Sequence, residues 1–151
     1  MSLVACGPEL ALAAKAEQIA VRSMTSLKPS TTWDTSTLVR GDFNGDGLPD
    51  WAMVGYRSTR IELGVRLSAR RPAKVRTQFL EFGIGSELQA AICDRPARLQ
   101  VEAQFCHPMD EALPGCKPSK HANSIILSGG DCDPIHLYWN SDTRTMDWWR
   151  L

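Results

Sequence analysis

The chain has 151 residues, of which 43% are hydrophobic, and its 17 basic and 17 acidic residues give a formal net charge of zero. This balance argues against a general nucleic-acid-binding protein, which would have a strong basic excess. No apolar run approaches the length that is needed to span a bilayer. Length and composition predict one globular domain with a sizeable core.

At the N-terminus, the tetrad Leu3-Val4-Ala5-Cys6 is similar to a bacterial lipobox, in which small residues precede a cysteine that becomes lipid-modified. The similarity implies that Cys6 is a lipidation site in the full precursor and that it anchors the protein in the cell envelope. The alternative is a short N-terminal segment in which Cys6 has no such role.

An amphipathic helix is predicted over residues 9–24. Its apolar stripe consists of Leu12, Ala16, Ile19 and Ala20. Two of these four side chains are alanines, so the stripe offers little apolar volume, and we expect this helix to pack on the surface of a sheet. A linker at residues 28–32 then separates an N-terminal segment with its helix (residues 1–32) from a single β domain (residues 33–151).

The most informative segment is residues 41–50, Gly-Asp-Phe-Asn-Gly-Asp-Gly-Leu-Pro-Asp. Counted from Asp42, positions 1, 3, 5 and 9 of this tight loop have side chains with oxygen atoms. Position 7 has none and offers its backbone carbonyl. The predicted calcium ligands are therefore Asp42, Asn44, Asp46, Leu48 (carbonyl) and Asp50. Calcium takes about six to eight oxygen ligands, and the two internal glycines permit the positive φ angles of such a curled backbone.

The alternative for this segment is a turn without metal, because Asp, Asn and Gly favour turns in general. An EF-hand would have Glu at position 12 of the loop, but this chain has Met53 there, in a stretch that looks like a strand. We therefore expect a calcium loop between two strands of a sheet, not between two helices.

The segment and the strand after it resemble the calcium loop of FG-GAP and VCBS-type repeats. Trp33 and Leu38-Val39-Arg40 fit the strand that enters such a loop. The resemblance covers about residues 33–56 and implies that the same five residues hold the metal. Repeated loops build propellers in that family, but this chain contains one copy, so we expect a relative with a single loop.

Seven basic residues lie between residues 57 and 76, with only Glu62 against them. They are Arg57, Arg60, Arg66, Arg70, Arg71, Lys74 and Arg76. One interpretation is a solvated hairpin face whose cations keep a sheet edge from pairing with other chains. The other is a docking site for an anionic partner.

Alternating or β-branched and aromatic stretches predict strands at 36–40, 51–57, 60–68, 74–82, 98–105, 123–128, 134–140 and 145–150. Short connections indicate antiparallel pairing. A short helix is predicted at residues 86–92, and a long loop at residues 106–122, which contain three prolines and two cysteines. The predicted fold class is α+β, with an N-terminal helix packed on one mainly antiparallel sheet that carries a calcium-binding loop.

Four of the five cysteines lie in the last sixty residues, namely Cys93, Cys106, Cys116 and Cys132. An even set in a loop-rich region predicts two disulfides and an oxidising compartment. The sequence leaves three connectivities open. The alternatives are a zinc cluster that includes the histidines, for which short ligand spacings are missing, and free buried thiols.

Four tryptophans lie in or beside predicted strands and are interpreted mainly as core residues. They are Trp51, Trp139, Trp148 and Trp149. Because neighbouring side chains in a strand point to opposite faces, one member of the Trp148-Trp149 pair is a candidate for a partly exposed contact.

The sequence contains no G-x-S-x-G, H-E-x-x-H, P-loop or G-x-G-x-x-G motif, and we predict that the protein is not an enzyme. Segments 122–127, 135–140 and 147–150 resemble small secreted bacterial proteins with one calcium loop, some of which are similar to periplasmic inhibitors of I-type lysozyme. That resemblance implies a curved antiparallel sheet, a protruding loop that plugs a hydrolase cleft, and an immunity role. The inhibitor loop reads Ser-Gly-x-x-Tyr, whereas residues 128–132 read Ser-Gly-Gly-Asp-Cys, which also fits a Gly-rich hairpin turn.

The resulting expectation is a calcium-binding, periplasmic or secreted cell-envelope protein that binds another macromolecule and no nucleic acid. Its specific form is an inhibitor or immunity protein against a peptidoglycan hydrolase, with the partner contact on loops 106–122 and 128–134. The alternative is an adhesion or glycan-binding module, which would present exposed aromatic side chains in a groove.

Overall fold

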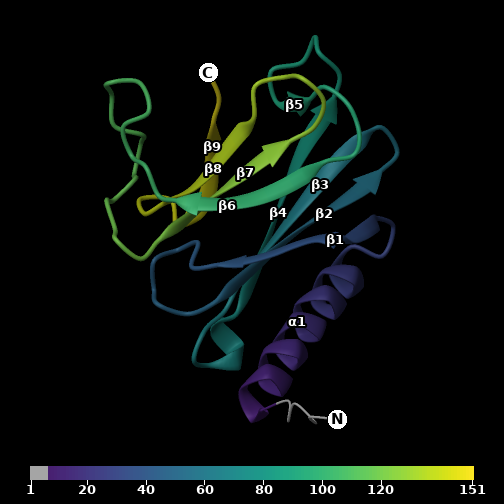
Figure 1. The fold of residues 1–151 in the computed structure, drawn as a ribbon, viewed down its shortest axis with the longest axis vertical. Coiled ribbons are helices and arrows are strands. Elements are labelled where there is room, and N and C mark those ends of the chain that lie inside the picture. The colour runs from purple at the N-terminus through teal and green to yellow at the C-terminus, as the bar shows by residue number, and fades with distance from the viewer. Residues whose placement is uncertain (1–6) are drawn as a thin grey trace, which may run out of the picture.

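The computed structural model describes residues 7–151, and Figure 1 shows its arrangement of one long helix and two sheets. In chain order, the elements are α1 (Pro8–Leu27), β1 (Thr32–Gly41), β2 (Asp50–Arg57), β3 (Arg60–Leu67), the short 3-10 helix η1 (Pro72–Lys74), β4 (Arg76–Ile84), β5 (Ala91–Ile92), β6 (Arg98–Ala103), β7 (Asn123–Ser128), β8 (Ile135–Asn140) and β9 (Thr145–Trp149). The first sheet has the order β1-β2-β3-β4-β5, and the second has the order β6-β7-β8-β9. Every pairing is antiparallel except that of β4 with β5.

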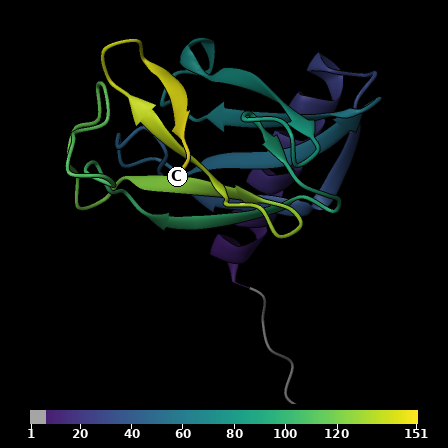
Figure 2. The same ribbon diagram turned by 90° about the horizontal axis from the view of Figure 1, so that it is seen from above.

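The two sheets form adjacent layers, and α1 lies on the face of the first sheet that points away from the second (Figure 1; Figure 2). Strand alternation explains this arrangement, because successive side chains point to opposite faces. In β3, Ile61, Leu63 and Val65 belong to the core between the sheets, which also contains Ile125 and Leu137 from the second sheet. The opposite face of the first sheet is covered by the helix.

The helix α1 packs on the sheet, as expected, but only part of the predicted stripe makes the contact: Ala16 and Ala20 face the sheet, whereas Leu12 and Ile19 are exposed. Ala20 and Met24 are fully buried and pack against Trp51 and Met53 of β2. At the C-terminal end of the helix, the buried Glu62 of β3 forms an ion pair with Lys28 (Nζ–Oε1 3.2 Å) and accepts a hydrogen bond from Thr31. Within residues 7–151, no helix is both long and apolar enough to cross a membrane.

The predicted α+β class is confirmed, and all eight predicted strands are present. Seven of them shift by at most two residues at either end, whereas β1 begins four residues before the predicted strand at 36–40. The predicted helix at residues 86–92 is wrong, because this segment turns back and adds β5 beside β4. Gly83 N–H donates to Ala90 O (2.8 Å) and Gly85 N–H donates to Ile92 O (2.8 Å). Ala91 and Ile92 are buried while Leu88 is exposed, so the segment has no continuous apolar stripe of the kind that holds a short helix in place.

The strands are divided between two sheets, although one sheet was expected. The helix packs on β2 and β3, and both sheets also have an apolar face that the helix does not touch. Stacking the two sheets buries both of these faces at once, which a single flat sheet with one helix does not achieve. At one edge, Gln78 of β4 joins the layers, because its amide donates to Met146 O (3.1 Å) and accepts from Met146 N–H (2.7 Å) in β9.

Two disulfides are present among the four predicted cysteines, and the structure selects one connectivity. Cys93 pairs with Cys132 (Cα–Cα 5.5 Å), and Cys106 pairs with Cys116 (Cα–Cα 5.6 Å). Since all four sulfurs are used, the zinc-cluster and free-thiol interpretations do not hold for these residues. The predicted lipidation site, Cys6, lies outside the described residues.

Removing each disulfide should destabilise the protein by a different amount. The bridges close loops with sequence separations of 39 and 10 residues, and a longer loop removes more entropy from the unfolded chain. Cys93→Ala/Cys132→Ala should therefore cost about 1 kcal/mol more than Cys106→Ala/Cys116→Ala, out of roughly 2–4 kcal/mol each. Urea unfolding measures the difference, with non-reducing peptide mapping of the parent protein as control. Mapping that joins Cys93 to either Cys106 or Cys116 would contradict the assignment.

Candidate metal centre

The predicted calcium loop, residues 42–49, connects β1 to β2 at one end of the two-sheet sandwich. Gly45 and Gly47 have φ angles of +74° and +85°, so the positive values expected from the sequence are present. Phe43 is fully buried and belongs to the core between the sheets. This side chain anchors the loop while its polar neighbours stay near the surface.

The oxygen-bearing side chains of the loop accept hydrogen bonds from the loop's own backbone. Asp46 N–H donates to Asp42 Oδ1 (3.1 Å) and to Asn44 Oδ1 (3.2 Å). Gly47 N–H donates to Asp42 Oδ2 (2.8 Å), and Leu48 N–H donates to Asp46 Oδ1 (2.9 Å). The backbone is therefore curled around oxygen-bearing side chains.

Asp50 is the buried member of the predicted ligand set. Its side chain is fully buried, and its two oxygens accept hydrogen bonds from Ser68 N–H (Oδ1, 2.8 Å) and Phe43 N–H (Oδ2, 2.8 Å). Burial raises the pKa of Asp50 from 3.8 to about 7, the nearby charges of Asp46 and Asp42 add to this rise, and the two N–H donors oppose it. Within residues 7–151, no cationic side chain forms an ion pair with this carboxyl group.

The donor chemistry of the loop fits calcium. Three carboxylates, one amide oxygen and one carbonyl form an all-oxygen set. A carboxylate has lone pairs left after two hydrogen bonds, so Asp50 retains the capacity to bind an ion that would offset its buried charge. Across residues 7–151, however, no three His, Cys, Asp or Glu side chains gather closely enough to hold a metal ion. Calcium binding by the five predicted ligands therefore stays a prediction.

The loop is also tied to the second sheet. Asp42 N–H donates to Asn123 Oδ1 (2.9 Å), and Asn123 N–H donates back to Asp42 O (2.8 Å). A side chain added at Gly45 would lie 3.5 Å from Ala122 Cβ, so the two backbones are close here. Sequence reasoning missed Asn123, because the two partners are 81 residues apart and nothing local marks the contact.

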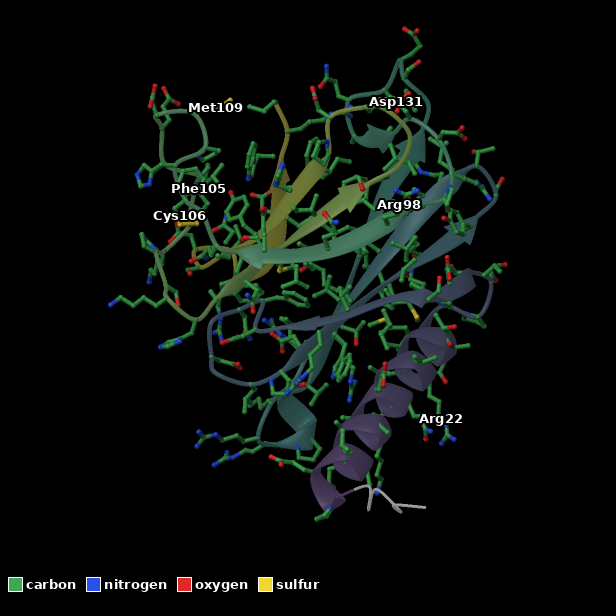
Figure 3. All side chains as sticks on the ribbon, in the orientation of Figure 1. Arg22, Arg98, Phe105, Cys106, Met109 and Asp131 are labelled. Atoms are coloured by element: carbon green, nitrogen blue, oxygen red, sulfur yellow. A yellow bond between two sulfur atoms is a disulfide. The ribbon has the colours of Figure 1, made fainter. Side chains whose placement is uncertain are left out.

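Residues 104–122 between β6 and β7 form a long loop, called the stapled loop below because the Cys106–Cys116 disulfide closes it. It projects from the sandwich on the side away from α1, and Figure 3 places Phe105, Cys106 and Met109 there. Phe105 and Met109 are 61% and 54% exposed. The loop thus presents two large apolar side chains to solvent.

Hydrogen bonds hold the stapled loop against the outer face of the second sheet. Tyr138 OH donates to Pro114 O (2.9 Å), and Ser141 N–H donates to Gly115 O (2.8 Å). Tyr138 itself is buried, and its burial together with the Asp147 carboxylate raises the pKa of the phenol to about 12. Tyr138 therefore supports the loop instead of forming part of an exposed contact.

The two C-terminal tryptophans point to opposite faces, as predicted. Trp148 packs against the core between the sheets and lies edge-on to Phe82 (ring centroids 6.0 Å apart). Trp149 stacks on His136 on the other face (centroids 4.2 Å apart), and His136 Nδ1 lies 2.9 Å from Glu102 Oε1. The Gly-rich segment at residues 129–134 connects β7 to β8 and is anchored by Cys132, which agrees with a hairpin turn.

Comparisons with protein-family models, with curated proteins and with solved structures found no match.

Calcium should raise the melting temperature, because an ion that binds only the folded state stabilises it by about 2.7 kcal/mol at a hundredfold excess over Kd. Asp46→Ala should abolish this response, since Asp46 is a predicted ligand. Asp131→Ala is the matched control, because Asp131 is an exposed carboxylate in another loop (Figure 3). Thermal unfolding in EDTA and in millimolar calcium measures the shift. Equal shifts in the two variants would rule out a site at Asp46.

In calcium-free protein, stability should fall as the pH rises from about 4 to about 7. The pKa of Asp50 is raised in the folded state, so in this range the folded state keeps a proton that the unfolded state has lost. The contribution is fully present below the unfolded pKa and is lost as the pH passes the folded pKa, at most roughly 4 kcal/mol.

Urea unfolding in EDTA between pH 4 and 8 measures this effect as the difference between the parent protein and Asp50→Asn, whose amide does not titrate. The variant should be less stable throughout, because its NH₂ group faces a backbone donor, but its profile should lack the Asp50 component. Parallel profiles would show that Asp50 stays ionised.

Proposed function

We propose that this protein is a calcium-binding, disulfide-bonded protein of the cell envelope, periplasmic or secreted, that binds and inhibits a peptidoglycan hydrolase and has no catalytic turnover of its own. The observation that carries the proposal is the stapled loop, which is closed by a disulfide and exposes Phe105 and Met109. Such an inhibitor would act as an immunity protein, because it would protect the cell that produces it.

The construction of the stapled loop favours binding to a protein. Exposed apolar side chains gain free energy when a partner removes them from water. A loop that is ordered before binding loses little conformational entropy in the complex. Three contacts restrict this loop. The Cys106–Cys116 bridge closes it, the Tyr138–Pro114 hydrogen bond holds it to the second sheet, and the Asp42–Asn123 pair fixes the residue that follows it.

The calcium loop has an indirect role in this proposal. It approaches Ala122 at the end of the stapled loop and is hydrogen-bonded to Asn123, the first residue of β7. An ion that orders residues 42–50 therefore also orders the base of the binding loop. The two disulfides support an oxidising compartment. The lipobox-like tetrad ending at Cys6 supports attachment of the precursor to the envelope.

A second candidate function is glycan binding, as in an adhesion module. It is favoured by the Trp149–His136 stack on the outer face of the second sheet, with Glu102 beside it. Flat aromatic rings next to a carboxylate offer an apolar surface and a hydrogen-bond acceptor to a sugar. The stapled loop would then have no part in the contact.

The proposal predicts that Phe105→Ala/Met109→Ala weakens inhibition of the partner hydrolase by about tenfold or more, since a truncated interface anchor costs about 1–2 kcal/mol or above. Leu12→Ala is the matched control, because Leu12 is an equally exposed apolar residue (67%) on the distant helix. The partner is first captured from the source organism and its competitors by pull-down, and cell-wall hydrolysis is then assayed with each variant. Capture of a soluble glycan, with no effect on any hydrolase, would falsify the inhibitor proposal.

A further inference from the structure

A cavity of about 560 Å³ lies where three connections of the chain meet. These are the calcium loop, the β3–β4 connection (residues 68–75) and the β8–β9 turn (residues 141–144). The polar and charged residues of its lining are Asn44, Asp46, Ser68, Lys74, Arg76 and Arg144. The site is thus adjacent to the calcium loop, and no residue of the stapled loop lines it, although the β8–β9 turn is hydrogen-bonded to that loop through Ser141 and Gly115.

The lining carries more positive than negative charge. Lys74, Arg76 and Arg144 are cations, and Asp46 is the acidic residue of the lining. Within residues 7–151, none of the three cations forms an ion pair with a carboxylate. Arg76 Nη2 donates to Arg144 O (3.2 Å), which holds two of the basic residues in the same wall.

Arg144 occupies a backbone position that does not suit it. Its φ angle is +56°, and its N–H closes the β8–β9 turn by donating to Asn140 O (2.8 Å). This left-handed region favours glycine or asparagine, and a long side chain there is strained. The turn therefore keeps a guanidinium group beside the cavity against the backbone preference, as is common at functional sites.

The basic residues of the segment at residues 57–76 are mostly exposed, as expected of a solvated face. Arg60 forms an exposed ion pair with Glu81 (3.7 Å), and the half-buried Arg66 donates to Ser23 Oγ (3.1 Å) on α1. Lys74 and Arg76 are exposed and also line the cavity. These two residues are therefore the part of the basic segment that is placed to meet an anion.

We propose that this cavity binds an oxyanion, the carboxylate or phosphate group of a ligand. Guanidinium groups pair with both through charge-assisted, often bidentate hydrogen bonds, and Lys74 adds a third cation to the lining. The inference goes beyond the inhibitor proposal and requires neither the stapled loop nor a hydrolase. A calcium ion held by Asp46 would neutralise the one acidic group of the lining and strengthen anion binding.

The test is an NMR titration of calcium-free protein at fixed ionic strength, with inorganic phosphate in one arm and succinate in the other. We expect saturable shifts of the Arg76 and Arg144 Nε–H signals. A response to phosphate alone identifies a phosphate ligand, and a response to both extends the site to carboxylates. Shifts that do not saturate in either arm would overturn the proposal.

Arg144→Gly is the most informative variant, because glycine suits the backbone at this position and the melting temperature should not fall. Its Kd for the responding anion should rise about tenfold or more, as expected for a lost hydrogen bond to a charged group. Lys74→Ala provides a second test in the exposed η1 segment. Arg98→Ala removes the same charge at a distant exposed site (Figure 3) and should bind like the parent. Equal weakening by Arg98→Ala and Arg144→Gly would show a general charge effect and contradict the site.

Discussion

A buried carboxylate, Asp50, joins three parts of the chain. It opens β2, and its two oxygens accept the backbone N–H groups of Phe43 in the calcium loop and Ser68 after β3. Within the described residues no cationic side chain pairs with it, and the protein groups that stabilise its charge are these two N–H donors. Burying a charge in this way is costly, which explains both the raised pKa and the affinity for a cation that we predict for the loop.

Asp50 and its two backbone donors, called the buried node below, hold the calcium loop in place. Two surfaces next to this loop depend on its position. On one side, the loop contacts Asn123 and Ala122 and supports the base of the stapled loop, where Phe105 and Met109 are exposed. On another side, Asn44 and Asp46 line the cationic cavity. The calcium loop is thus placed to influence protein binding at one surface and anion binding at another, without contacting either ligand through Asp50 itself.

The parts that could be predicted from sequence are those encoded locally. Period-two alternation is sufficient to find a strand such as β3, a short run of β-branched and aliphatic residues marks β7, and alternating oxygens with two glycines mark the calcium loop. The disulfide partners, the Asp42–Asn123 contact and the convergence of Arg76 with Arg144 join residues that are far apart in the chain, and no local pattern encodes them. The predicted helix at 86–92 failed because pairing beside β4 outweighed weak local propensity. The two-sheet arrangement buries an apolar face of each sheet. This need is not visible in any single strand and is recognised only when all strands are considered together.

The most direct test of this account is amide hydrogen exchange, measured in saturating calcium and in chelator. If calcium acts through the buried node, exchange should slow at Phe43 and Ser68, which donate to Asp50, and at Asn123, which donates to Asp42 at the base of the stapled loop. If protection changes only within residues 44–48, and the three anchoring amides exchange as before, then the loop binds calcium without transmitting order to the rest of the structure, and the account is contradicted.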